Sequence, residues 1–297
     1  MPQNSEPMKE FDARIVQAPM VGLFRNIDGD LSRRLKGAMT GRDKSDERIT
    51  SLFLIMLRVT KNSYGAIRLL SATPSDSPKH EPEYVLAVAP IERQLLDLLF
   101  TIIDLKEDFP ARAEAYELSG YRQAREIYDR HHRKYRNDPS WQSRFKELGE
   151  TIANMETYLS ITPAQKATPK SIERWLGPYK LAQRATKHKT IMEYLDSWFY
   201  GEVSSQAHLN AGGLTSVAGF LITDFAPEEH KHLVERYLSR YTFRHFTRSL
   251  IAVLAILHEI NDSFKLDYDE TLARVWTLLG GHCDEAKEVY ELRYKNL

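Results

Sequence analysis

Two charged residues on an otherwise apolar helix are the first candidates for chemistry. Arg93 and Asp97 lie four residues apart in a stretch, 88–105, whose apolar side chains cover most of a helical circumference. Residues at this spacing share one helix face, so the two charges can pair. Charge on so apolar a helix costs free energy unless it is paired or lines a cavity. Arg93 and Asp97 therefore predict either a polar pocket or a structural ion pair at a thin, solvent-facing edge of the helix.

A serine and a histidine about one turn apart are the second candidate. Ser205 and His208 share a predicted helix face in the segment that begins at Tyr200. An imidazole can act as acid, base or ligand near neutral pH. Nucleophilic catalysis also needs an orienting acid and an oxyanion hole, and the sequence has no GxSxG elbow. The alternative is a hydrogen-bonded, buried histidine that fixes helix packing.

A third pattern fits the ribonuclease site of HEPN proteins, where an arginine precedes a histidine by four to six residues. Arg240 with His245 has this spacing, as do two pairs that begin at Arg125. The histidine would act as acid or base and the arginine would clamp a phosphate. The residue after the arginine is usually polar in HEPN proteins, whereas Tyr241 follows Arg240 here. Such pairs also arise by chance in a chain with ten histidines.

Metal, nucleotide and phosphate sites have weaker signals. Carboxylate-bridged bundles use two Glu-x-x-His pairs, but this chain offers one clear copy, Glu229 with His232. Gly212 and Gly213 are typical of a turn and not of a nucleotide-binding loop. A basic run over 122–136 could bind phosphate, although charged helix faces are usually only solvated. We therefore expect no metal and no cofactor.

Composition narrows the class of protein. The 297 residues include 42% hydrophobic and 28% charged side chains, which is typical of a globular protein. Lys plus Arg and Asp plus Glu are equal at 41 each, so nucleic-acid or membrane binding would need a local patch. A single cysteine, Cys283, excludes an intrachain disulfide and favours a reducing compartment. The longest apolar run, 250–257, is too short to span a bilayer. We expect a soluble, cytoplasmic protein without membrane contact.

Hydrophobic spacing at threes and fours predicts helices along most of the chain and no strands. Residues 1–40 are polar and weakly patterned, so we expect a loosely attached arm there with a short helix at 31–39. Residues 41–297 should form one helical domain. Its expected helices span 49–70, 88–105, 110–136, 141–159, two pieces of 175–200, 224–261 and 267–294. The fold class is all-α, a mostly antiparallel multi-helix bundle with two buried central helices, 88–105 and 246–260.

Several motifs, taken in order, resemble an uncharacterised family of bacterial helical proteins, a domain of unknown function. The resemblance covers roughly residues 85–215 and rests on Ile91-Glu-Arg-Gln-Leu-Leu-Asp, Phe109-Pro-Ala-Arg, Trp175 and the segment Tyr200 to His208. The family's Arg-x-x-x-Glu is matched by Arg93 and Asp97, a shortened acid. Its Leu-Ser-x-x-x-His is matched approximately by Val203, Ser204 and His208. The resemblance implies the fold and the choice of residues, and it implies no reaction.

Two functions follow as hypotheses. The first is an interaction or regulatory module whose cluster of Arg93, Asp97, Ser205 and His208 is structural or binds a small ligand, with a protein partner as the other option. The second is a HEPN-like, metal-independent ribonuclease in a phage-defence or toxin-type system, which would cleave RNA with that cluster or with Arg240 and His245. Helical bundles often pair through their faces, so a homodimer is compatible with either hypothesis.

Overall fold

The computed structural model describes residues 14–71, 86–207 and 227–295, and every regular element within these ranges is a helix. The all-α prediction is confirmed. The helices are α1 (Arg14–Gly41), α2 (Lys44–Leu70), α3 (Val88–Leu105), α4 (Phe109–Tyr135), η2 (Pro139–Trp141), α5 (Gln142–Tyr158), α6 (Pro163–Ala167), η3 (Pro169–Ser171), α7 (Pro178–Arg184), α8 (Lys189–Leu195), η4 (Asp196–Tyr200), α9 (Gly201–Ala207), η5 (Glu228–His230), α11 (Lys231–Phe264), α12 (Asp269–Gly280) and α13 (Asp284–Arg293). None of the described helices is both long enough and apolar enough to cross a membrane.

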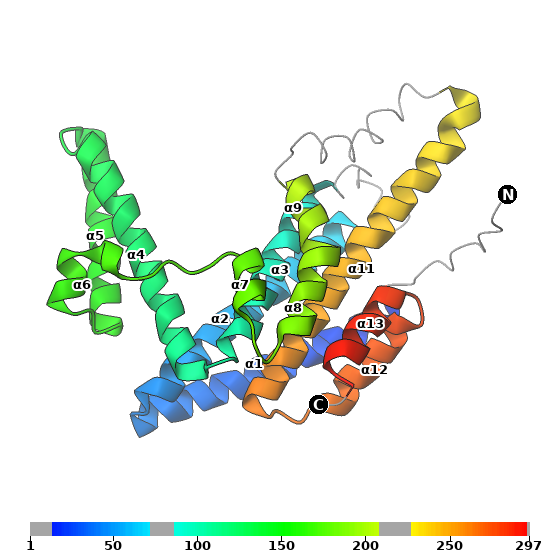
Figure 1. The fold of residues 1–297 in the computed structure, drawn as a ribbon, viewed down its shortest axis with the longest axis horizontal. Helices are drawn as coiled ribbons and strands as arrows, with labels where there is room; N and C mark the ends of the chain where they lie inside the picture. The colour runs from blue at the N-terminus through cyan, green and yellow to red at the C-terminus, as the bar shows by residue number, and fades with distance from the viewer. Residues whose placement is uncertain (1–13, 72–85, 208–226, 296–297) are drawn as a thin grey trace.

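Two helices are buried over most of their length, as their apolar sequences predict. In α11 every residue from 245 to 261 is buried, because apolar side chains point in all directions along 250–257. In α3 the buried positions include Leu95, Leu99 and Ile103. The two helices pack against each other, and α2, α9 and α7 complete the surroundings of α3 (Figure 1). The mostly antiparallel order of the bundle stays a prediction.

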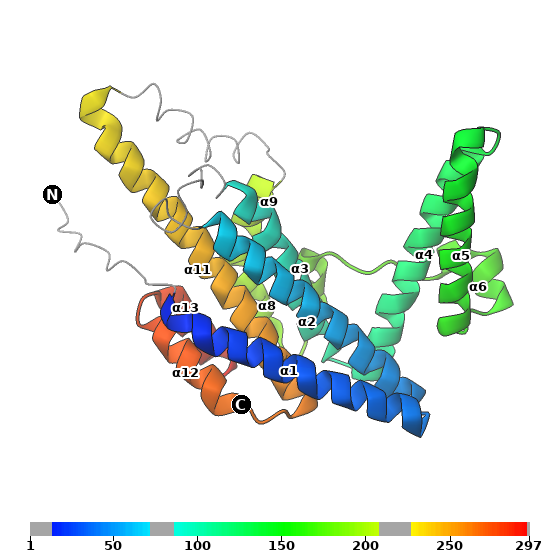
Figure 2. The ribbon, with the colours of Figure 1, turned by 180° about the vertical axis from the view of Figure 1, so that it is seen from behind.

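The first helix differs from the expected polar arm over residues 1–40. Residues 14–41 form α1, which lies across α2, α11 and α12 (Figure 2). Its buried face belongs to the main core and consists of Val16, Met20, Leu23, Phe24, Ile27 and Leu31. These residues recur at threes and fours, but Pro19 and the glycines between them obscure the pattern. Residues 1–13 lie outside the described part of the chain.

A helical arm projects from this body and carries a small core of its own. The arm consists of α4, α5, α6 and η3, and both ribbon views show it standing away from the other helices (Figures 1 and 2). Its core contains Tyr121, Ile152, Leu159, Ile161 and Ile172. The fully buried Asp104 of α3 anchors the arm, because Arg112 donates to it at 3.0 Å and Arg184 of α7 donates at 2.9 Å.

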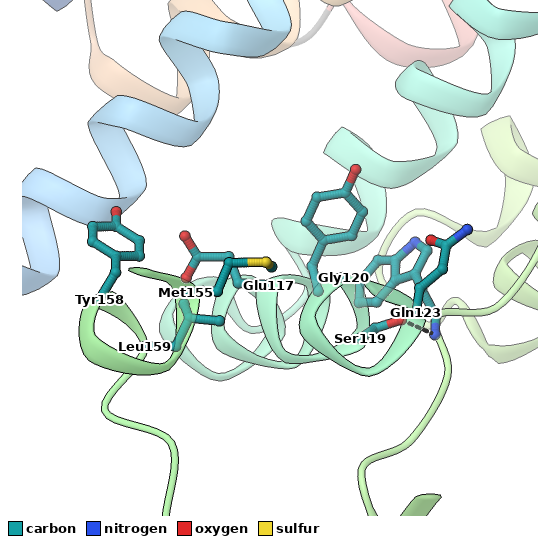
Figure 3. A pocket seen from close by; sticks show the side chains of 9 residues that line it. Glu117, Ser119, Gly120, Gln123, Met155, Tyr158 and Leu159 are labelled. Carbon is teal, nitrogen blue, oxygen red and sulfur yellow. Dashed lines mark hydrogen bonds between the residues drawn. The ribbon is translucent and has the colours of Figure 1, made fainter. Parts of the chain in front are cut away.

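A pocket of about 410 Å³ lies at the base of the arm. Figure 3 shows that Glu117 and Gln123 reach it from α4 and Met155 reaches it from α5. Arg48 of α2 donates to Glu117 at 3.0 Å, which neutralises the carboxylate at the pocket. The remaining lining is mostly apolar or aromatic and includes Tyr158.

The helix that leads to the candidate site contains a π-helical turn. Helices α8 and α9 are continuous, and Asp196–Tyr200 between them adopts the π form. A π turn accommodates one more residue than an α turn, so it changes which side chains face a neighbouring helix. Phe199 within this turn is buried, as are Val203 and Gln206 after it. The break that the sequence predicted near 186–190 is present, between α7 and α8.

Candidate functional site

The structure places Arg93 and Asp97 beside Tyr200. The Nη2 atom of Arg93 donates to the Tyr200 hydroxyl at 3.2 Å, and the guanidinium lies 5.6 Å from the centre of the tyrosine ring. Arg93 Nε is 4.0 Å from a carboxylate oxygen of Asp97, which is a loose pair. The two side chains are 23% and 45% exposed. This part of α3 is therefore a half-buried polar edge where α3 meets the helix that ends in α9.

Burial raises the pKa of the Tyr200 hydroxyl at this edge. The negative charge of Asp97 also raises this pKa, whereas Arg93 lowers it. The hydroxyl therefore stays protonated at neutral pH and remains a hydrogen-bond donor. Ser205 lies further along the same continuous helix and is half-buried. His208, its predicted partner, lies outside the described residues.

The histidine of the predicted ribonuclease pair has a different partner. His245 Nδ1 is 2.7 Å from Glu92 Oε2, and the two side chains are 1% and 0% exposed. Burial raises the pKa of Glu92, although the hydrogen bond from His245 opposes that rise. Arg240 is exposed. It lies five residues before His245, and this spacing places the two side chains on different faces of α11. Arg240 and His245 therefore do not share one surface in this structure.

An arginine one turn beyond His245 connects α11 to α9 and α13. Arg248 is 1% exposed, and its Nη1 atom donates to Glu202 of α9 at 2.9 Å. Its Nη2 atom is 3.5 Å from Glu285 of α13, and the guanidinium lies 5.1 Å from the ring centre of Phe199. Arg244, on the outer side of α11, also contacts Glu202 at 2.7 Å. One carboxylate thus binds two arginines from successive turns of α11.

Four buried polar atoms near these contacts have no hydrogen-bond partner in the described part of the chain. They are Glu92 Oε1, Gln206 Oε1, Arg248 Nε and Ser249 Oγ. Glu92 contacts His245 of α11, and Arg248 contacts Glu202 of α9. Gln206 lies one turn after Glu202, and Ser249 lies one turn after His245, so each continues the face of the helix that makes one of these contacts. A buried polar atom without a partner costs about 1–3 kcal/mol. We call Glu92, Glu202, Gln206, His245, Arg248 and Ser249 the polar junction.

Sequence reasoning missed two members of the polar junction that its own rule could have found. Glu92 lies on the same apolar helix as Arg93, and Arg248 lies immediately before the apolar run 250–257. Both are charges on helices too apolar to carry them without a partner. Glu202 carries no comparable local signal, because only the tertiary contact with α11 identifies it.

A second buried ion cluster lies at the opposite end of α3. The fully buried Glu259 of α11 accepts from Lys106 at 2.6 Å, from Arg293 at 2.8 Å and from the Tyr294 hydroxyl at 3.0 Å. These charge-assisted contacts outweigh burial and hold the pKa of Glu259 at about 2. Lys106 also contacts Asp262 at 2.7 Å. Every charge in this cluster is paired, so we assign it to the stability of the fold.

Metal-binding side chains do not gather anywhere in the described residues. No group of three or more His, Cys, Asp or Glu is arranged there to hold a metal ion. Glu229 of η5 and His232 in the first turn of α11, the clear Glu-x-x-His pair of the sequence, are both exposed.

Comparisons of this chain with protein-family models, with curated proteins and with solved structures found no match. The resemblance to a bacterial helical family therefore stays a prediction that rests on the motifs alone.

Proposed function

We propose that the protein is a helical interaction or regulatory module that binds a small polar ligand at the polar junction. The observation that supports this is the set of four unpartnered, buried polar atoms, contributed by three helices. Together they would cost several kcal/mol, which is a substantial part of the 5–15 kcal/mol that usually separates the folded from the unfolded state of a protein. A ligand with complementary donors and acceptors recovers much of this free energy when it binds.

The charges around the junction favour an uncharged or zwitterionic ligand. Three arginines, at positions 93, 244 and 248, face three carboxylates, Asp97, Glu202 and Glu285. The ligand would approach from the side on which Arg93, Glu202 and Arg244 are 23%, 34% and 49% exposed. Arg248 Nε and Ser249 Oγ can donate hydrogen bonds, and Glu92 and Gln206 can accept them. A small molecule with both an acceptor and a donor, such as an amide or an amino acid, satisfies this set.

The ribonuclease hypothesis has weaker support in the described residues. Its Arg240 and His245 lie on different sides of α11, and His245 is occupied by Glu92 in a buried hydrogen bond. A general acid or base must reach the proton that it transfers, directly or through one water molecule. Binding, and not RNA cleavage, is therefore the function that we advance for this junction.

Thermal unfolding in the presence of amino acids, nucleosides, polyols and small amides tests the proposal. A ligand present at 100 times its Kd adds about 2.7 kcal/mol to the free energy of unfolding, so its melting shift is easily measured. Gln206→Leu and Ser249→Ala should abolish the shift, whereas Gln123→Leu, an exposed amide on α4, should preserve it. A crystal structure with only ordered water on the four atoms, together with no shift from any compound, would contradict the proposal.

Incubation with total RNA tests the alternative directly. Cleavage that disappears in His245→Ala or His208→Ala, with the helical circular dichroism unchanged, would replace the binding proposal by the ribonuclease. We expect no cleavage that depends on either histidine.

A further inference from the structure

The tip of the arm gathers positive charge that no carboxylate of the described residues neutralises. We define the tip as residues 128–146, which comprise the end of α4, η2 and the start of α5. It contains the cations Arg130, Arg133, Lys134, Arg136, Arg144 and Lys146. None of the six makes an ion pair with a carboxylate in the described ranges, whereas Arg122 and Arg174 near the base of the arm both bind Glu126. In a chain of zero net charge, the tip is therefore a local positive patch.

The two acidic residues of the tip are already engaged. Asp129 lies 3.6 Å from Arg125, one turn back on α4. Asp138 accepts hydrogen bonds from the Ser140 backbone N–H at 2.9 Å and from the Ser140 hydroxyl at 2.7 Å, which starts η2. These bonds to Ser140 lower the pKa of Asp138. Neither carboxylate pairs with any of the six cations.

An aromatic stack supports the cations. The rings of Tyr135 and Trp141 are 4.2 Å apart and nearly parallel, and His131 stacks on the same indole at 5.1 Å. Arg144 lies over Trp141 at 5.3 Å, and the ammonium of Lys134 lies over Tyr135 at 5.0 Å. Cation–π contacts of this kind restrict otherwise flexible side chains. A cation that is already restricted loses less entropy when it binds an anion.

The tip lies away from the rest of the fold. Both ribbon views show the connection between α4 and α5 at the end of the arm that is remote from the body (Figures 1 and 2). The arm's own core, around Tyr121 and Ile152, lies nearer its base. Arg133 donates to the Asp129 carbonyl oxygen at 3.2 Å, but neither this bond nor the ring contacts neutralise the charge of the tip. Six like charges on one hairpin repel one another, and a bound polyanion relieves that repulsion.

We propose that the tip of the arm binds the phosphate backbone of single-stranded nucleic acid. Four of the six cations are arginines, whose planar guanidinium groups bind phosphate through two parallel hydrogen bonds. The rings of Trp141 and Tyr135 are half-exposed, and their free edges can make edge-to-face contacts with unpaired bases. An anionic membrane suits the tip less well, because the tip exposes no large hydrophobic residue that could insert into the bilayer and add to the electrostatic attraction. The proposal does not depend on the polar junction.

Fluorescence anisotropy with a fluorescein-labelled, 20-nucleotide oligouridine RNA tests the proposal. Contacts to about four phosphates give a slope of log K against log salt of about −3, so binding should weaken roughly 50-fold between about 50 and 200 mM salt. The same assay with a DNA oligomer and with duplex RNA identifies the preferred strand type. A shallow salt dependence, or no binding at low salt, would overturn the proposal.

A pair of triple variants of equal charge locates the binding surface. The side chains of Arg130, Arg136 and Lys146 make no hydrogen bond or ring contact with other described residues, so their replacement by alanine should leave the fold intact. Binding should weaken at least tenfold in this variant. The control replaces three exposed cations of the body, Lys36→Ala, Lys61→Ala and Arg274→Ala, and should bind like the original protein. Equal weakening in both variants, or binding only to phosphatidylserine vesicles, would refute the assignment to nucleic acid.

Discussion

Replacement of the buried carboxylate of Glu259 by an amide should change both the stability of the protein and its dependence on pH. The contacts with Lys106 and Arg293 hold the pKa of Glu259 at about 2, against an ordinary value of 4.5. Because each pKa unit corresponds to 1.36 kcal/mol, ionised Glu259 contributes roughly 3 kcal/mol. Glu259→Gln leaves two buried cations with less compensation, so the loss at pH 7 should be about 3–5 kcal/mol.

The sign of the pH dependence distinguishes this effect from a simple loss of packing. A lowered pKa means that the contribution is complete above about pH 4.5 and is lost as the pH falls toward 2. Urea unfolding followed by circular dichroism between about pH 3 and 7 should therefore show a shallower pH profile for Glu259→Gln than for the original protein. Glu150→Gln, at an exposed position of α5, is the control and should keep the original profile. A Glu259→Gln profile parallel to the original would refute the reasoning.

Four other substitutions test the junction and the arm. Burial raises the pKa of Glu92, so the stability linked to its neutral form is complete below about pH 4.5 and is lost as the pH rises. Glu92→Gln should remove this loss of stability above about pH 4.5, as followed by denaturant titrations at increasing pH. Arg248→Ala should lower the free energy of unfolding in urea by about 3–5 kcal/mol because Arg248 is buried. Arg244→Ala removes a half-exposed contact to the same Glu202, so it should lower that free energy by less than about 1 kcal/mol. Gly120→Ala should raise the unfolding free energy by about 0.5–1 kcal/mol in thermal melts, because an added Cβ meets no atom within 4 Å inside helix α4.

Local sequence patterns predicted the burial of those helices whose apolar residues all lie within one continuous segment. The apolar circumference of 88–105 and the apolar run at 250–257 are each contained in one segment, so the burial of α3 and of the second half of α11 follows from composition and period. Helix α1 was harder to predict because Pro19 and four glycines interrupt its apolar spacing. Burial of its apolar face also requires α2 and α12 to be in place.

In the candidate site, too, the sequence predicted contacts within one helix but not contacts between helices. The spacing of Arg93 and Asp97 predicted a pair on one helix face, and their atoms approach to 4.0 Å. The hydroxyl of Tyr200, which completes that edge, lies 107 residues away in sequence. His245 and Glu92 are separated by 153 residues, and no period within one helix relates them. Contacts of this kind depend on how the helices cross, which sequence patterns within one segment do not specify.

The π turn at Asp196–Tyr200 gives the chain a tolerance for length at that point, because it holds one residue more than an α turn needs. Removal of a single residue there would restore ordinary α-helical winding with little rotation of the helix downstream, since each kind of turn completes about one revolution. The carboxylate of Glu202 would then stay beside the buried guanidinium of Arg248. A one-codon deletion in this turn should therefore be tolerated better than a second one, which would rotate Glu202 by about 100° away from α11.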